Sequence, residues 1–166
     1  ETGMYDYPSQ YLPTESAVNP INGDIYVVDG YGLNYVIQYS SKGEYIRHWG
    51  GQGTENNQFR CCHGILVDQR NKNKVTLIIT SRVDNCWKKF SLDGQYISTI
   101  ALPGSFICRP VIKGDLLMGA VGLFFVRVGI SGLRVTDTKE LAPRVEILQS
   151  SLASFRSQSS GEGQTL

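Results

Sequence analysis

Short apolar runs alternate with turn residues along most of the chain. The runs Ile25–Val28 and Val75–Ile79 are rich in β-branched and aromatic side chains, which favour strands, and residues typical of turns bound both of them. The dipeptides Asn22-Gly23 and Asp93-Gly94 predict hairpin turns, because glycine adopts a positive φ at low cost. The repeated part of the chain shows no 3.6-residue apolar period, so we expect an all-β fold there.

One stretch of this pattern repeats at an offset of 51 residues. Residues 39–46 (YSSKGEYI) align with residues 90–97 (FSLDGQYI), and residues 24–29 align with residues 75–80 at the same offset. Each unit therefore predicts an apolar strand, a turn carrying Tyr31 or Arg82, a second strand, a Ser-x-x-Gly turn and a third strand. Three to four short strands in about 50 residues is the pattern of a β-propeller blade.

A third unit begins near Ser105, because residues 106–111 align with residues 60–65 at the start of the second unit. Arg109 falls opposite His63 in this alignment and is expected to point toward the same central channel. The chain stays strand-like to Asp137, but no further Ser-x-x-Gly turn follows. We predict about two and a half propeller blades over residues 13–137, preceded by an N-terminal segment, residues 1–12.

The C-terminal part is different in kind. Pro143 is suited to the first turn of a helix, and apolar residues follow it at helical spacing: Val145, Leu148, Leu152 and Phe155. We expect a helical extension over residues 138–156 and a disordered polar tail over residues 157–166. This change predicts a truncation, a fused foreign end or an altered reading frame.

Composition excludes some partners. The 166-residue chain has a formal net charge of +1 and 19% charged residues, so it lacks a bulk electrostatic attraction for nucleic acid or anionic membranes. No run of 18 apolar residues exists, so no membrane-spanning helix is expected. The lysines at positions 72, 74, 88 and 89 form no dense patch and are expected to be solvated. We expect neither a nucleic-acid nor a membrane partner.

The four cysteines leave the redox state open. Their even number permits two disulfides without requiring them, and the adjacent Cys61 and Cys62 cannot pair with each other without strain. No Cys-x-x-Cys pair is present, which argues against a zinc ribbon.

The ordered motifs of residues 13–111 resemble the NHL-repeat six-bladed β-propellers. The likeness is greatest to the peptidyl-α-hydroxyglycine α-amidating lyases (peptidylamidoglycolate lyases). It rests on the Asp-Gly-Tyr turn at residues 29–31, Gln58-Phe59, His63-Gly64-Ile65 and Thr80-Ser81-Arg82. These enzymes break a carbinolamide C–N bond and release glyoxylate. By resemblance we expect a secretory or extracytoplasmic setting.

The resemblance also implies roles for particular residues. Tyr31 would be a catalytic base, Arg82 a catalytic residue that holds the glyoxylate carboxylate, and His63 a zinc ligand. Arg109 would bind an anionic group of the substrate. Each also has a plainer interpretation: a packing tyrosine, an arginine paired with Asp84 or a neighbouring carboxylate, and a structural histidine.

The zinc site of that family uses three histidines from different blades, whereas this chain has two histidines in total. Cys62 could replace a missing imidazole as a soft ligand or could be a buried thiol. We therefore expect an incomplete ligand set and little or no activity from this chain alone. The alternative is a non-catalytic propeller that binds a peptide, a glycan or a protein through its top face or its open sheet edges. A sugar-lactone or strictosidine-type hydrolase is less well supported, because the expected acidic metal-ligand cluster is missing.

Overall fold

The computed structural model describes residues 3–102, 104, 106–121, 124–129 and 132–134. Their regular structure is β, apart from one short 3-10 helix, η1 (Pro8–Gln10). The predicted all-β class is therefore confirmed. No helix in these ranges is long and apolar enough to cross a membrane. The predicted C-terminal helix and polar tail lie outside the described residues.

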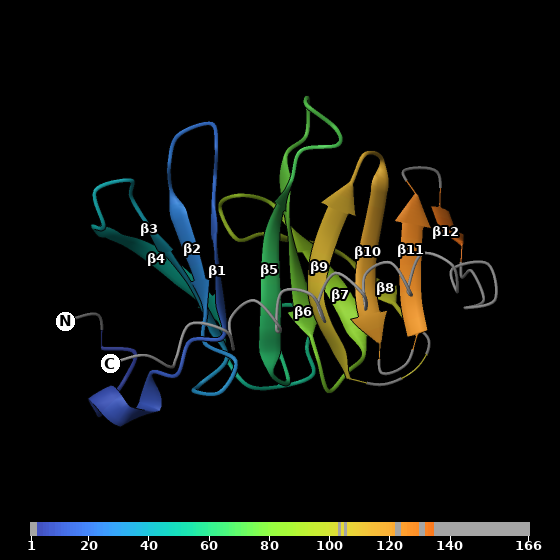
Figure 1. Cartoon of the computed structure of the whole chain (residues 1–166). Coiled ribbons are helices and arrows are strands. Elements are labelled where there is room, and N and C mark those ends of the chain that lie inside the picture. Colours follow the sequence, from blue (N-terminus) through green and yellow to red (C-terminus); the bar gives the residue numbers. More distant parts are fainter. Residues whose placement is uncertain (1–2, 103, 105, 122–123, 130–131, 135–166) are drawn as a thin grey trace, which may run out of the picture. The chain divides into compact units, whose positions relative to one another are not determined.

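The described strands form three antiparallel sheets of four strands each, and within each sheet the strands pair in the order of the chain (Figure 1). The first sheet contains β1 (Glu15–Val18), β2 (Ile25–Val28), β3 (Tyr35–Tyr39) and β4 (Tyr45–Gly50). The second contains β5 (Cys62–Asp68), β6 (Thr76–Ser81), β7 (Cys86–Phe90) and β8 (Tyr96–Ala101). The third contains β9 (Ile107–Lys113), β10 (Leu116–Val121), β11 (Phe124–Gly129) and the three-residue β12 (Gly132–Arg134).

Successive sheets meet through their first strands. β1 contacts β5, and β5 in turn contacts β9, as Figure 1 shows. Four-stranded antiparallel sheets that follow one another in this way are propeller blades. The described chain is a partial β-propeller, and its third blade, expected to be partial, has four strands that end with the short β12.

The second sheet is buried on both faces. Along β6, Leu77 and Ile79 join a core with the first sheet, whereas Ile78 between them joins a core with the third sheet. Successive side chains of a strand point to opposite faces, so one apolar run serves two interfaces. This is why the run at residues 75–79 has no polar alternation.

The two Ser-x-x-Gly turns have the same hydrogen bonds, as the repeat predicts. Ser40 Oγ accepts from the backbone N–H of Glu44 at 3.2 Å, and Ser91 Oγ accepts from that of Gln95 at 2.9 Å. Gly43 and Gly94 have φ values of 83° and 90°, a conformation that favours glycine.

The uniform offset of 51 residues is wrong for the apolar strands. Val36 and Trp87 are 51 residues apart and pair with Val28 and Thr80, which are 52 apart. The difference arises because seven residues lie between the paired Val28 and Val36, whereas six lie between the paired Thr80 and Trp87. A slip of one residue exchanges the two faces of a strand, so this correction decides which side chains face each core.

Candidate functional site

Three segments that are distant in the sequence meet at Tyr31. Tyr31 lies in the β2–β3 turn, His63 at the start of β5, and Arg82 directly after β6. Tyr31 Oη lies 2.8 Å from His63 Nε2, and Arg82 Nη1 donates to Tyr31 Oη at 3.3 Å. The Tyr31 and His63 rings meet edge to face, with centroids 5.4 Å apart. The structure thus brings together the three residues that the sequence predicted for the site.

Arg109 completes what we call the Tyr31 cluster (Tyr31, His63, Arg82 and Arg109). Its Nε lies 3.0 Å from Glu15 Oε1, so an ion pair connects β9 to β1. Its charge nevertheless acts on His63, whose pKa it helps to lower. Arg109 thus contributes a positive charge to the cluster, but its guanidinium already has a carboxylate partner.

Two asparagines hold the starts of the inner strands, and the sequence analysis missed both. The Cys62 N–H donates to Asn34 Oδ1 at 3.0 Å, and the Ile107 N–H donates to Asn85 Oδ1 at 3.3 Å. Cys62 and Ile107 are therefore equivalent, and the next residue in each blade gives the pair His63 and Cys108. The predicted alignment of Arg109 with His63 is wrong by one position. The 51-residue spacing of the two asparagines was the signal that could have revealed them.

Glu15 and Gly64 were also missed, and they explain how Arg109 reaches across β5. Glu15 Oε2 accepts from the Ile65 N–H at 2.9 Å while Oε1 pairs with Arg109. A Cβ at Gly64 would lie 2.9 Å from the Arg109 Cα and 3.1 Å from Glu15 Oε2. Only a glycine leaves room for this ion pair beside β5, and no local sequence pattern indicated that requirement.

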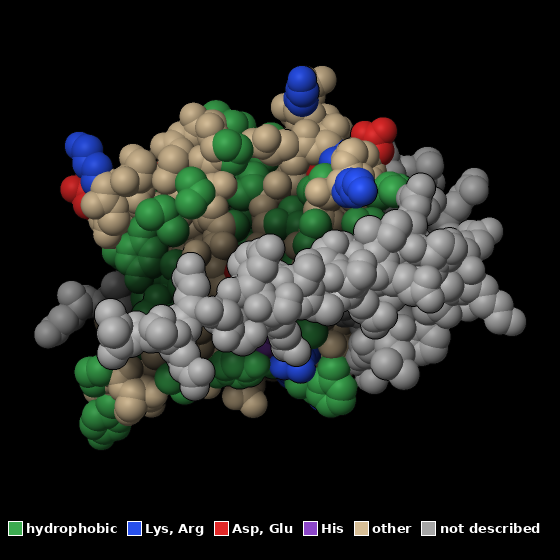
Figure 2. All heavy atoms as spheres, in the orientation of Figure 1, with side chains coloured by type: hydrophobic (Ala, Val, Ile, Leu, Met, Phe, Trp, Pro, Cys, Tyr) green, Lys and Arg blue, Asp and Glu red, His purple; other side chains and the backbone are tan. Residues whose placement is uncertain are grey.

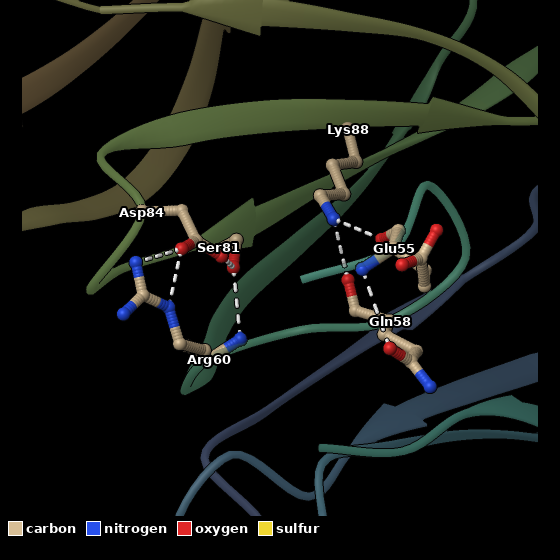
Figure 3. Close-up of polar contacts among 6 residues, drawn as sticks. All are labelled: Glu55, Gln58, Arg60, Ser81, Asp84 and Lys88. Atoms are coloured by element: carbon tan, nitrogen blue, oxygen red, sulfur yellow. Dashed lines mark hydrogen bonds and ion pairs between the residues drawn. The ribbon is translucent and has the colours of Figure 1, made fainter. Parts of the chain in front are cut away.

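The turn that carries Arg82 is fastened to the segment before β5 (Figure 3). Arg60 forms an ion pair with Asp84 at 2.5 Å, and Ser81 Oγ donates to Asp84 Oδ2 at 2.6 Å and accepts from the Arg60 N–H at 3.0 Å. The Arg82 N–H donates to the Cys61 carbonyl at 2.9 Å. Asp84 is thus the partner of Arg60, which leaves the Arg82 side chain directed at Tyr31.

Lys88 is buried rather than solvated, contrary to the sequence-based expectation. It is 4% exposed, and its Nζ donates to the carbonyls of Glu55 and Gln58 at 2.8 and 2.5 Å (Figure 3). The ammonium also lies 5.6 Å from the Phe59 ring centroid. A buried ammonium needs such partners, and here they hold the connection from the first blade to the second.

Burial is the main reason that the pKa of His63 is lowered, and the positive charges of Arg82 and Arg109 lower it further. The imidazole is therefore neutral at pH 7. Among the described residues, Nδ1 is buried without a hydrogen-bond partner, whereas Nε2 faces Tyr31. A neutral imidazole in this position can accept a proton from the phenol.

We expect the Arg109→Gln variant to raise the pKa of His63, because it removes one positive charge near the imidazole. A ¹H–¹⁵N NMR titration of His63 measures this change. In the wild-type chain the titration midpoint of His63 should lie below 6.5, the ordinary value of an unfolded histidine. Between that midpoint and pH 6.5 the unfolded chain binds more protons than the folded chain, so the free energy of unfolding should increase with pH. Arg47→Gln is the control, since Arg47 contacts the Asp93 carbonyl instead; a His63 pKa that changes equally in both variants would contradict the assignment.

The described residues do not form a complete zinc site. They contain no group of three or more His, Cys, Asp or Glu side chains arranged to hold a metal. His48 lies on the outer strand β4 with its Nδ1 2.7 Å from Tyr45 Oη. Cys62 is fully buried, and burial raises the pKa of its thiol, so the buried-thiol interpretation holds. All four cysteines are free thiols.

Fold and cluster together define a class: a partial β-propeller with tyrosine, histidine and arginine side chains in contact where one blade meets the next. The chain is 39% identical over 59 residues to peptidyl-glycine alpha-amidating monooxygenases A and B of Xenopus laevis. It is 35% identical over the same length to the enzyme of Mus musculus. These alignments cover 33% of this chain and 6–7% of the relatives, so the chain matches a small part of their length.

Solved structures agree on the fold. A Bacteroides caccae protein of unknown function aligns with a TM-score of 0.53 and 17% identity, over 75% of this chain and 44% of that one. A catalytically inactive variant of Staphylococcus aureus virginiamycin B lyase, crystallised with quinupristin, aligns with a TM-score of 0.53 and 18% identity, over 80% of this chain and 42% of that one. No protein-family model matches the chain.

Proposed function

We propose that the chain forms part of an NHL-type propeller lyase that cleaves the C–N bond of peptidyl-α-hydroxyglycines. The observation that carries this proposal is the contact of Tyr31 Oη with both His63 Nε2 and Arg82 Nη1. It joins a phenol, an imidazole and a guanidinium from three segments. The 59-residue similarity to amidating monooxygenases supports the same reaction class.

The described residues would contribute two things to the proposed reaction, a proton transfer and the binding of a carboxylate. Tyr31 takes the proton of the substrate hydroxyl and passes its own to Nε2 of neutral His63. The O–H electron pair then forms the aldehyde carbonyl of glyoxylate, and the C–N pair leaves with the nitrogen. The proton returns from His63 through Tyr31 to that nitrogen, so the products are a peptide amide and glyoxylate. Arg82 holds the carboxylate, with Arg109 nearby as a second positive charge.

Zinc enters this proposal through the resemblance alone. With zinc bound, His63 would supply one ligand through Nε2, because Nδ1 is buried, and Nε2 would then no longer accept the Tyr31 proton. The metal would instead make the substrate hydroxyl more acidic, so that Tyr31 alone takes its proton. The described residues do not complete the ligand set. We therefore propose that the isolated chain holds less than one equivalent of zinc and lacks turnover.

Two measurements test this proposal: the binding of glyoxylate, the product, and the release of glyoxylate from a substrate. We expect sodium glyoxylate to shift the NMR signals of the His63 imidazole, and Arg82→Gln to abolish the shift. Tyr31→Phe should keep carboxylate binding, because it removes only the phenol oxygen. Glyoxylate release from a peptidyl-α-hydroxyglycine should remain at the uncatalysed rate, and elemental analysis should find well below one zinc per chain.

Two results would overturn parts of this proposal. Glyoxylate binding that is absent or independent of Arg82 would refute the carboxylate site and favour a non-catalytic binding propeller. Measurable glyoxylate release by the purified chain, lost in Tyr31→Phe, would refute the proposed inactivity of the isolated chain while supporting the role of Tyr31.

A further inference from the structure

Phe106, directly before β9, combines a strained backbone with an exposed ring. It is 58% exposed and has a φ of 56°, a conformation that bulky residues rarely adopt. The equivalent residue before β5 is Cys61, with a φ of 63°. The hydrogen bond from the Ile107 N–H to Asn85 Oδ1 holds this geometry. Strain of this kind is retained at functional sites more often than elsewhere, so the exposed ring calls for an explanation.

The ring of Phe106 lies against the Tyr31 cluster. The Arg82 guanidinium carbon is 5.7 Å from the ring centroid, and Arg82 Nη1 donates to Tyr31 Oη. Phe106, Arg82 and Tyr31 thus form a continuous row, and the neighbouring Val83 is 49% exposed. In Figure 2, hydrophobic, basic and histidine side chains come close together at the lower edge of the described surface. The row offers a ligand an apolar surface next to a cation.

Arg82 is the cation in this row that lacks a carboxylate partner. In the described part of the chain, Asp84 pairs with Arg60 and Glu15 pairs with Arg109, and none of the ion pairs there includes Arg82. In the same part of the chain, Arg82 Nε is buried, so a ligand would meet the terminal nitrogens of the guanidinium. A guanidinium whose charge has no carboxylate partner attracts a carboxylate and forms charge-assisted hydrogen bonds with it. The surface therefore favours an anionic ligand.

We propose that Arg82 and Phe106 form a subsite for small aromatic carboxylates, in which Arg82 binds the carboxylate and Phe106 packs against the ring. This inference assigns a ligand class to the same cluster and so rests on the proposed function for its setting. In that reaction the subsite would favour substrates with an aromatic group close to the hydroxyglycine carboxylate.

The experiment is an NMR titration with sodium acetate, sodium phenylacetate and sodium cyclohexylacetate at matched ionic strength, followed on the amides of Val83 and Ile107. We expect phenylacetate to bind about tenfold more tightly than acetate, because a ring contact is added to the carboxylate contact. Cyclohexylacetate should fall between the two, since it keeps the apolar area but loses the aromatic geometry. Arg82→Gln should abolish binding of all three.

In Phe106→Leu, the affinity for phenylacetate should fall to the affinity for cyclohexylacetate. Phe106→Gly should remove the preference and at the same time relieve the backbone strain, so it tests the ring in a chain that folds at least as well. Val111→Ala is the matched control, because Val111 is 54% exposed on β9 itself. Equal affinity for phenylacetate and acetate, or a preference unchanged in both Phe106 variants, would overturn the subsite.

The two proposals fail separately. If phenylacetate binds in a Phe106-dependent manner while glyoxylate does not bind, the proposed lyase function fails and the aromatic carboxylate subsite stands. If glyoxylate binds through Arg82 but phenylacetate binds no better than acetate, the subsite alone fails.

Discussion

Gly30→Ala is expected to lower the free energy of unfolding by about 3 kcal/mol and to break the Tyr31–His63 contact. A Cβ at Gly30 would lie 2.2 Å from the carbonyl oxygen of Cys62 and 2.7 Å from its carbonyl carbon. Both atoms belong to the backbone of β5, so relief requires the β2–β3 turn to move away from that strand. Urea unfolding followed by circular dichroism measures the loss, and the His63 NMR signals report on the contact.

Gly43→Ala is the matched control for this substitution. Gly43 has open space around its Cα but a φ of 83°, so alanine there should cost about 1–2 kcal/mol from backbone strain alone. The control should leave the His63 signals unchanged. A Gly30→Ala protein with the stability of the control and unchanged His63 signals would show that the turn does not lie against β5 as described.

Trp87→Ala is expected to cost about 3–5 kcal/mol, because it removes the largest side chain from the core between the second and third sheets. Trp87 is fully buried there with Ile78, Leu102, Ile107 and Leu117. Gly119 on β10 approaches its ring so closely that a Cβ would lie 2.5 Å from the indole. Small domains are stable by only about 5–15 kcal/mol, so this single change should bring unfolding to much lower urea concentrations.

The control for Trp87 is Ile97→Ala on the outer strand β8. Ile97 is 37% exposed, and its truncation should cost about 0.5 kcal/mol. Both proteins are compared by urea unfolding with circular dichroism as the signal. Equal stability of the two variants would mean that the third sheet does not depend on Trp87 for its packing.

The strands and turns could be predicted because their signals are local. The apolar runs and the Ser-x-x-Gly turns each involve residues within one blade, and the structure confirms them. The offset of the apolar strands was wrong by one residue, because a turn that differs in length leaves little trace in composition. Tyr31 and Arg82 could still be assigned to the equivalent turns of the first and second blades, because an error of one position does not move a residue out of its turn.

The contacts that define the site could not be predicted in this way. The role of Glu15 depends on Gly64 leaving room for Arg109 beside β5, and that requirement exists only once β1, β5 and β9 lie together. The sequence predicts Lys88 to be a solvated charge on a strand, yet the side chain is buried and donates to two carbonyls of the inter-blade connection. Such contacts join residues separated by long stretches of chain, and no local pattern encodes their distances.

By itself the sequence determined the blade pattern of three to four short strands, their hairpin turns and the residue types at each turn, because strand propensity and turn chemistry act between near neighbours. Only the tertiary structure decided that Tyr31, His63 and Arg82 touch, that Asp84 pairs with Arg60, and that Phe106 stays exposed beside Arg82. The physical reason is that these contacts depend on the packing of one blade against the next, which positions side chains from different repeats to within a hydrogen-bond length.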